Sequence, residues 1–473
     1  MPPPFEAETQ LERTLGFTAA LTIGIGTMIG AGIFVLPGAA AAEAGPAIVI
    51  SFLIGGAIAL LTALSASELA TAMPQAGGGY HFINRGLGPA FGAIAGFGNW
   101  LGLAFASAFY VIGFGSYLGI LLAVLFDPIS VTLGLFELTQ TQLGGLLAGV
   151  LFIAVNYVST KSTGDLQNVI VFGLLAILAV FITLGVVGGD FQTLRPIAPE
   201  GWGAVLPGTA LVFVSFLGFV KITTVAGEIK RPSTNLPRAI VGSVVIVTIL
   251  YAVIMMVVLG VVDRADIADS ETAVAEVAGL LFGHYLGLAA LGVGLLTFGG
   301  LLATASSANA SILAASRINF AMGRDGIVMP SVSAVNDRFK TPSRAIVLTG
   351  ICIILLVLIG DIAVLAKSAS VLHLVVYGLL NIALIILRET DGIGYEPAFR
   401  VPFYPWTPIV GAIASFALIA FMDPIEIALA IGLIVASLLW YLAYARRRTV
   451  DTSALARLRT PEQVEARVEM DDD

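Results

Sequence analysis

Residues 24–34 read Gly-Ile-Gly-Thr-Met-Ile-Gly-Ala-Gly-Ile-Phe and lie inside an apolar run that is long enough to cross a lipid bilayer. Four glycines within nine residues disfavour a continuous helix, so we predict a break in the helix here. A break at this depth exposes backbone N–H and C=O groups that lipid cannot satisfy, and it is tolerated only where protein, water or a ligand satisfies them. The stretch therefore predicts a small-molecule site, and the alternative is close helix packing through small residues.

The composition is that of a membrane protein. The 473 residues are 58% hydrophobic and only 11% charged, and the mean hydropathy of +0.98 lies far outside the range of soluble globular proteins. Apolar runs of about 20 residues recur along the chain, which predicts helical spans. We expect no cleaved signal peptide, and nothing basic and aromatic resembles a nucleic-acid surface.

The apolar runs predict twelve transmembrane helices. Their approximate ranges are 16–42, 46–72, 91–125, 143–159, 166–187, 202–226, 240–262, 285–320, 345–360, 362–387, 406–421 and 425–445. An even number of spans places both termini on one side. All of the 23 Lys and Arg residues except Arg195, Lys221, Arg264 and Lys367 fall on that side, so the positive-inside rule predicts cytoplasmic termini and a multi-pass protein of the cell (cytoplasmic) membrane.

A second interruption is predicted in the sixth span. Residues 213–228 read Phe-Val-Ser-Phe-Leu-Gly-Phe-Val-Lys-Ile-Thr-Thr-Val-Ala-Gly-Glu, which places a glycine, a lysine and two threonines deep in the hydrocarbon. Spans one and six correspond if the chain is two repeats of five helices, and because five is odd the second repeat is inverted. Paired Gly-interrupted helices at corresponding positions point to a transporter's midplane site, which favours a ligand site over simple packing.

The chemistry of the two interruptions predicts an amino acid ligand. The outer half of the first span is expected to begin near Gly30 and to present free N–H groups, suited to a carboxylate, from Gly30, Ala31 and Gly32. Unpaired carbonyls that suit an ammonium group are expected at Met28, Ile29, Phe216 and Leu217. Selection of the ligand side chain is expected from neighbours, namely Thr27, Phe213, Phe216, Val220 and residues 107–110. A Gly32→Leu change is expected to fill the carboxylate site without unfolding the protein.

These residues resemble the amino acid, polyamine and organocation transporter family, in particular its cationic amino acid transporter branch. The resemblance covers residues 15 to about 445. Besides 24–34 with the following Val-Leu-Pro-Gly, it is carried by Pro-x-Ala-Gly-Gly-Gly-Tyr at 74–80, Ala-Gly-Glu-Ile-Lys-Arg-Pro-Ser-Thr-Asn-Leu-Pro at 226–237, and Ser-Arg-x-x-x-Ala-Met-Gly-Arg-Asp-Gly at 316–326.

The resemblance implies an all-α polytopic fold of the leucine-transporter type, with ten helices in two inverted five-helix repeats, helices 1 and 6 broken, and two peripheral helices. It implies alternating access with an amino acid or amine substrate, a carboxylate-binding turn at 30–32, and ammonium-binding carbonyls at Phe216, Leu217 and Phe219. The corresponding division of the chain is a cytoplasmic segment 1–15, a first repeat 16–190, a second repeat 191–390, helices 11 and 12 at 400–445, and a cytoplasmic tail 446–473.

The sequence departs from the family pattern in its charged residues. Several members carry a lysine in the fifth helix, whereas residues 166–187 have none, and Val214 and Val220 stand where an acidic residue or aromatic gate is often found. Lys221 is the intramembrane charge instead. It could bind a substrate carboxylate, replace a sodium ion or exchange a proton, and the alternative is that it snorkels or faces a water-filled vestibule.

Coupling to Na⁺ or H⁺ has further candidates. Ala303, Ser306 and Ser307 offer hydroxyls and carbonyls to a sodium ion, although Ser and Thr in membrane helices commonly bond the preceding turn. His373 begins a polar stripe with Tyr377 and Asn381, which either lines the pathway or forms an interhelical network. No catalytic motif accompanies the histidines, so we expect no enzyme, metal centre or cofactor beyond a coupling ion. The predicted function is secondary amino acid transport by symport or exchange. The alternatives are a polyamine or amine transporter, a channel, and a non-transporting amino acid sensor.

Overall fold

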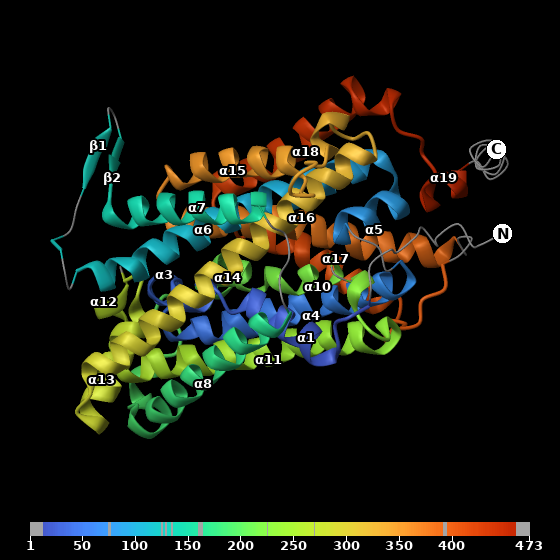
Figure 1. Ribbon diagram of the computed structural model, residues 1–473. Coiled ribbons are helices and arrows are strands. Elements are labelled where there is room, and N and C mark those ends of the chain that lie inside the picture. Colours follow the sequence, from blue (N-terminus) through green and yellow to red (C-terminus); the bar gives the residue numbers. More distant parts are fainter. Residues whose placement is uncertain are drawn as a thin grey trace.

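The structure is a computed structural model and describes residues 13–73, 77–123, 126–127, 130–133, 136–158, 164–224, 226–268, 270–390 and 395–459. Long helices run side by side along an elongated bundle (Figure 1). One end of the bundle carries α5 (Gly78–Leu87) and α19 (Ala454–Arg459), and the other carries α12 (Arg264–Ile267) and α13 (Ala273–Leu286). The predicted segments 1–15 and 446–473 are therefore described only from residue 13 onwards and up to residue 459.

Helices make up most of the described chain. In the first half they are α1 (Phe17–Met28), α2 (Ala31–Phe34), α3 (Pro37–Ala44), α4 (Ile48–Ala72), α5, α6 (Pro89–Leu122), α7 (Gln140–Val158) and α8 (Gly164–Gly188). In the second half they are α9 (Val205–Val212), α10 (Lys221–Thr224), α11 (Pro232–Val261), α12, α13, α14 (Ala289–Arg324), α15 (Ser343–Val357), α16 (Ile362–Glu389), α17 (Trp406–Ile419), α18 (Pro424–Ala443) and α19.

The connection between α6 and α7 departs from the all-helical expectation. It contains a small antiparallel hairpin of β1 (Val131–Leu133) and β2 (Phe136–Leu138), in which Val131 lies opposite Leu138. Strands of three residues are too short to produce a recognisable alternation in the sequence. The bundle itself is helical, as predicted.

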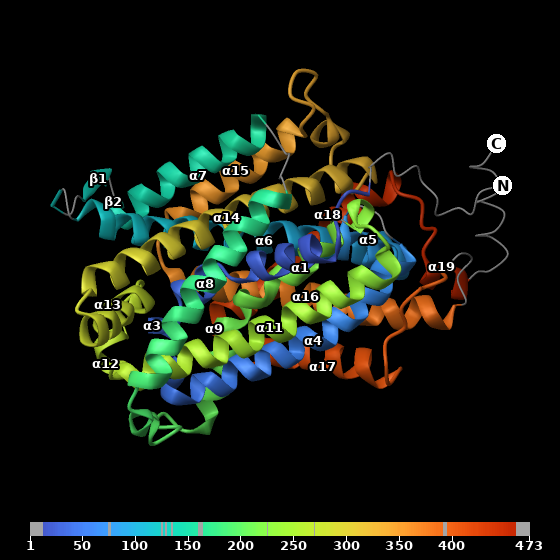
Figure 2. The ribbon, with the colours of Figure 1, turned by 60° about the horizontal axis from the view of Figure 1, so that its bottom comes forward.

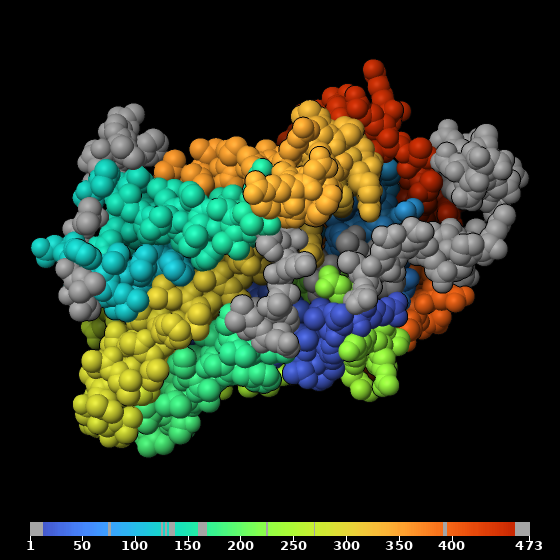
Figure 3. Space-filling model, viewed as in Figure 1, coloured from blue at the N-terminus to red at the C-terminus, as the bar shows by residue number. Residues whose placement is uncertain are grey.

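Many of the helices are suited to a lipid environment. Nine segments of the described chain are long and apolar enough to cross a membrane: 37–72, 89–122, 140–158, 168–188, 202–223, 232–261, 289–324, 362–389 and 424–447. Their outer faces carry large apolar side chains, and Leu147, Val169 and Ile425 are each 69% exposed. Figure 3 shows α7, α14 and α8 forming one such face. An apolar surface of this extent fits contact with lipid.

The two predicted interruptions differ in form. The first span breaks outright, because α1 ends at Met28, α2 begins at Ala31, and Ile29 and Gly30 between them leave helical geometry. The sixth span was also predicted to break, but it stays wound: α9 passes into an eight-residue 3-10 helix, η4 (Phe213–Val220), and then into α10. The first span has four glycines, whose backbone can leave helical geometry at low cost, whereas η4 has one. The sixth span is therefore distorted by tightening into a 3-10 helix instead of breaking.

Candidate functional site

The first and sixth spans touch at their interruptions through glycines. A Cβ atom on Gly218 of η4 would lie 2.6 Å from the backbone N of Met28 and 2.6 Å from the carbonyl carbon of Thr27. A Cβ on Gly32 of α2 would lie 2.2 Å from Oγ and 2.9 Å from Cα of Ser215. The two spans are therefore in backbone contact at both positions, which only glycine permits.

Winding as a 3-10 helix gives η4 three distinct faces, because residues three apart are superposed. Phe213, Phe216 and Phe219 form an aromatic face. Ser215 and Gly218 form the face against α1 and α2, and Lys221 continues it by one turn. The third face carries Leu217 and Val220, which line a cavity.

The aromatic face of η4 is enclosed by two tyrosines. Phe216 lies 5.6 Å from Tyr251 of α11, and Phe219 lies 5.3 Å from Tyr377 of α16, measured between ring centroids. Phe213 contacts Tyr377 at 6.1 Å, and all of these rings are buried. Figure 2 shows that α11, which carries Tyr251, runs beside both α1 and α4. The walls around the interruptions are thus apolar and aromatic.

The tyrosine hydroxyls correct one expectation about the carbonyl groups. Tyr251 donates to the carbonyl oxygen of Met28 at 2.5 Å and lies 3.3 Å from that of Ser215, so it bridges the two interruptions. Tyr377 donates to the carbonyl oxygen of Leu217 at 3.5 Å. Met28 and Leu217 were expected to be unpaired, but a buried carbonyl needs a donor and the neighbouring helices provide one.

The turn predicted to bind a carboxylate lies at the start of α2. Gly30 precedes the helix, and the N–H groups of Ala31 and Gly32 have no partner within it because they belong to its first turn. All three residues are buried. The expectation that Gly32→Leu only fills a ligand site is wrong, because Ser215 already occupies that space and a larger side chain would push the spans apart.

Lys221 follows η4 directly as the first residue of α10, which contacts α5. Its Nζ donates to Ser311 Oγ of α14 at 2.7 Å and lies 5.6 Å from the centroid of the Tyr110 ring. It borders a small cavity of about 20 Å³. The cavity lining comes from five parts of the chain: Gly77, Gly78, Gly79, Asn99, Leu103, Leu217, Val220, Lys221, Ala314, Ile318 and His373. Four predicted site residues, Leu217, Val220, Lys221 and His373, are therefore brought together.

The polar stripe of α16 divides into two parts. Asn381 donates to Thr62 Oγ1 at 3.0 Å and accepts from Ser65 Oγ at 2.6 Å, so it belongs to an interhelical network with α4. His373 faces the cavity instead, with its Nδ1 2.9 Å from the carbonyl oxygen of Ala369 in its own helix. The interhelical network is thus present at the Asn381 end of the stripe, and a role of His373 in a pathway stays a prediction.

The candidate sodium ligands also differ from one another. Thr304, beside the buried Ala303, donates back to Gly300 of its own helix at 2.7 Å. Ser307 points toward the first span, with Oγ 3.5 Å from the carbonyl oxygen of Gly26, and a Cβ on Gly30 would lie 2.3 Å from it. Ser306, which directly precedes Ser307 in α14, is half-buried. Ser307 therefore reaches the broken helix, whereas Thr304 bonds within α14.

The start of the first span is tied to the end of the sixth span. The backbone N–H of Leu15 donates to the carbonyl oxygen of Glu228 at 2.9 Å, and the N–H of Lys230 donates to that of Leu15 at 2.8 Å. This short parallel bridge joins the residues before α1 to those after α10. The first and sixth spans are therefore linked at this end of the bundle as well as at Gly218.

Sequence reasoning missed Tyr251, Ser215, Ser311 and Asn99. For Tyr251 a usable signal existed, because a tyrosine inside an apolar run needs an acceptor for its hydroxyl, and a broken helix supplies free carbonyls. For the other three the partner is fixed by interhelical contacts far apart in sequence, which no local pattern records.

Comparison with known proteins agrees with this architecture, since a membrane bundle built around two interrupted helices is typical of transporters. The chain matches the amino acid permease family over residues 15–444 and belongs to that family. It is 29% identical over 449 residues to the branched-chain amino acid permease of Bacillus subtilis, covering 93% of this chain and 95% of that one. It is 29% identical to the methylthioribose transporter of the same organism (85% and 87% covered), and 30% identical to the mitochondrial cationic amino acid transporter 3 of Arabidopsis thaliana (80% and 63% covered).

These relatives confirm the family resemblance, including its cationic branch, and the general function. The protein is a multi-pass membrane permease of the amino acid permease family, and its relatives are transporters rather than enzymes.

Proposed function

We propose that the protein moves an amino acid across the cytoplasmic membrane by alternating access around the contact between α1–α2 and η4. The observation that carries the proposal is the backbone contact of two distorted helices at Gly32 and Gly218, beside a cavity that Lys221 borders. Such distortions are stable in a membrane when they serve a ligand. The bridge at Leu15 makes the inner halves of both spans one moving unit.

The proposed layout has twelve spans with both termini in the cytoplasm. Nine of the spans are the segments that are long and apolar enough to cross a membrane. The other three are the broken first helix and the shorter helices α15 and α17, which have 15 and 14 residues. α13 lies outside this count as a surface helix. The first ten spans form two inverted repeats of five, and α17 and α18 are peripheral.

The proposed substrate is an amino acid with a neutral side chain. Its carboxylate would meet the N–H groups of the 30–32 turn, and its ammonium group would meet the carbonyl of Ile29. The carbonyls of Phe216 and Phe219, which the sequence predicted to be free, are paired within the wound helix η4. The positive charge of Lys221 disfavours a cationic side chain at this position, and the surrounding aromatic rings favour an apolar one. A neutral, apolar side chain is in keeping with the name of the branched-chain amino acid permease of Bacillus subtilis.

Uptake of labelled leucine by purified protein in proteoliposomes tests the proposal. We expect unlabelled leucine to compete, whereas its methyl ester and its decarboxylated amine should not, since both lack the carboxylate. Competition by the amine alone would favour an amine or polyamine transporter. Binding of leucine without uptake, even into vesicles preloaded with leucine, would favour a sensor.

Coupling is tested with inward Na⁺ and H⁺ gradients. Accumulation driven by Na⁺ and lost in Ser307→Ala would support an ion, carried as cargo, between Ser307 and Gly26. Accumulation driven by H⁺ and altered in Lys221→Met or His373→Gln would support proton exchange at the cavity. Uptake that requires internal amino acid under both gradients would identify an exchanger.

A further inference from the structure

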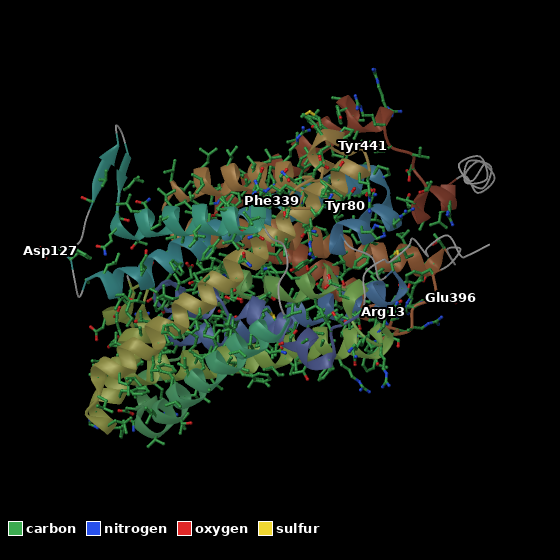
Figure 4. All side chains as sticks on the ribbon, in the orientation of Figure 1. Arg13, Tyr80, Asp127, Phe339, Glu396 and Tyr441 are labelled. Atoms are coloured by element: carbon green, nitrogen blue, oxygen red, sulfur yellow. The ribbon has the colours of Figure 1, made fainter. Side chains whose placement is uncertain are left out.

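A second cavity lies at the end of the bundle that carries α5, away from the two interruptions. Its volume is about 310 Å³. It is bounded by α5, the end of α14 and the chain after α18, and it is lined by His81, Asn84, Arg85, Pro89, Arg324, Asp325, Thr449, Val450, Thr452 and Ser453. Figure 4 shows Tyr80, which precedes these α5 residues, near that end of the molecule, and Asp127 at the opposite end.

The walls of this cavity are held in place by specific contacts. The chain after α18 lies against two glycines with positive φ: a Cβ on Gly88 would lie 3.0 Å from Asp451 Oδ1, and one on Gly326 would lie 3.0 Å from the carbonyl oxygen of Arg448. Side chains at these glycines would push the chain away. On the opposite wall, Tyr80 donates to Asp325 Oδ2 at 2.9 Å and joins α5 to the end of α14.

The charged groups of the cavity lining are two arginines and one aspartate. Asp325 is engaged by Tyr80 and by Arg324, whose Nε lies 3.4 Å from Oδ1. Burial, together with the charges of Arg85 and Arg324, lowers the pKa of His81 to about 4, so this imidazole is neutral at pH 7. Two guanidinium groups, those of Arg85 and Arg324, therefore line the cavity with the Asp325 carboxylate, while the Asp451 carboxylate in the wall accepts from the backbone N–H of Ser453 at 3.1 Å. The hydroxyls of Thr452 and Ser453 add uncharged hydrogen-bonding groups on the third wall.

We propose that this cavity binds a phosphate group through Arg85 and Arg324, supported by the hydroxyls of residues 452 and 453. Guanidinium groups in pairs, with hydroxyl donors, are the usual protein partners of phosphate oxygens. The phosphate is that of a lipid headgroup or of a small soluble phosphate ester, and both present the same oxygens. α5 connects this site to the transport pathway, because Gly77, Gly78 and Gly79 line the cavity at Lys221.

The test uses the purified full-length protein and measures its thermal unfolding midpoint, which a ligand of the folded state raises. The probes are inorganic phosphate, with sodium sulfate at equal ionic strength as reference, and phosphatidic acid in phosphatidylcholine nanodiscs, with phosphatidylcholine alone as reference. The variant Arg85→Gln/Arg324→Gln should fold normally, because Arg85 is exposed and the Arg324 side chain is 58% exposed. Arg338→Gln removes an exposed charge elsewhere and is the matched control.

We expect a probe to raise the midpoint of the wild type and of Arg338→Gln, and to bind the double variant at least tenfold more weakly, about 1.4 kcal/mol. A shift with inorganic phosphate identifies a soluble ester as the ligand type, and a shift with phosphatidic acid alone identifies a lipid headgroup. No shift with either probe, or equal shifts in the double variant, would overturn the proposal. The measurement involves no transport, so its outcome is independent of the function proposed above.

Discussion

The two interruptions meet at one place but are built differently. The first span loses its helix at Ile29 and Gly30 and leaves backbone N–H groups at the start of α2 without helical partners. The sixth span keeps a tightened helix, and its three faces point side chains toward the aromatic shell, the first span and the cavity. The first span thus contributes backbone and the sixth contributes side chains. A transport site needs both, since the backbone can recognise what all amino acids share and side chains can distinguish among them.

The largest effect is expected at Gly218, where the contact is backbone against backbone. In Gly218→Ala the new methyl group would lie 2.6 Å from atoms of the first span that cannot rotate away. We expect a loss of about 3 kcal/mol or more of folding free energy and little folded protein, measured by size-exclusion chromatography after heating. Gly432→Ala in α18 is the control, because nothing lies within 4 Å of that position. Normal stability of Gly218→Ala would mean that the spans are not in contact there.

A smaller and reversible effect is expected at Gly30. The only atoms closer than 3 Å to a Cβ at this position belong to the side chain of Ser307. Gly30→Ala should therefore cost about 2 kcal/mol, and much of the loss should be recovered by adding Ser307→Gly. The same exchange at the neighbouring glycine, Gly32→Ala with Ser215→Gly, should fail, because Cα of Ser215 remains 2.9 Å away. Equal rescue of both pairs would contradict this difference between side-chain and backbone contact.

The same residues show which features of the two interruptions can be predicted from the sequence. The break at Gly30 was predictable, since glycine density acts locally on the helix that contains it. The state of the sixth span was not, because a single glycine permits either a break or a tighter helix and the choice depends on packing against Tyr251 and Tyr377. The candidate turn at 30–32 was predictable because the backbone N–H groups at the start of a helix have no partner within it. The contact between Ser215 and Gly32 was not, because the two residues are far apart in sequence. The substrate and ion roles stay predictions.

Tyr251→Phe probes the hydroxyl that bridges the interruptions. Its removal leaves the buried carbonyl of Met28 without this donor, and we expect a loss of about 1 to 3 kcal/mol with the aromatic contacts intact. The unfolding midpoint in detergent measures it. Tyr285→Phe, at a 41% exposed tyrosine of α13, is the control and should be neutral. If both variants were equally stable, the hydrogen bond of Tyr251 to Met28 would not contribute to the stability of the broken first span.

The smallest effect is expected at Thr27, which also links the spans. Its Oγ1 lies 3.0 Å from the carbonyl oxygen of Gly218 and 2.7 Å from that of Ile23 in its own helix. A hydroxyl has one proton, and the shorter distance favours the bond within α1. Thr27→Val should therefore cost less than about 1 kcal/mol of folding free energy, measured through the unfolding midpoint. Thr27→Ser keeps the hydroxyl and so separates the loss of the hydroxyl from the change in side-chain shape. A larger loss for Thr27→Val than for Tyr251→Phe would show that the direct bond to Gly218, rather than the tyrosine bridge, couples the two spans.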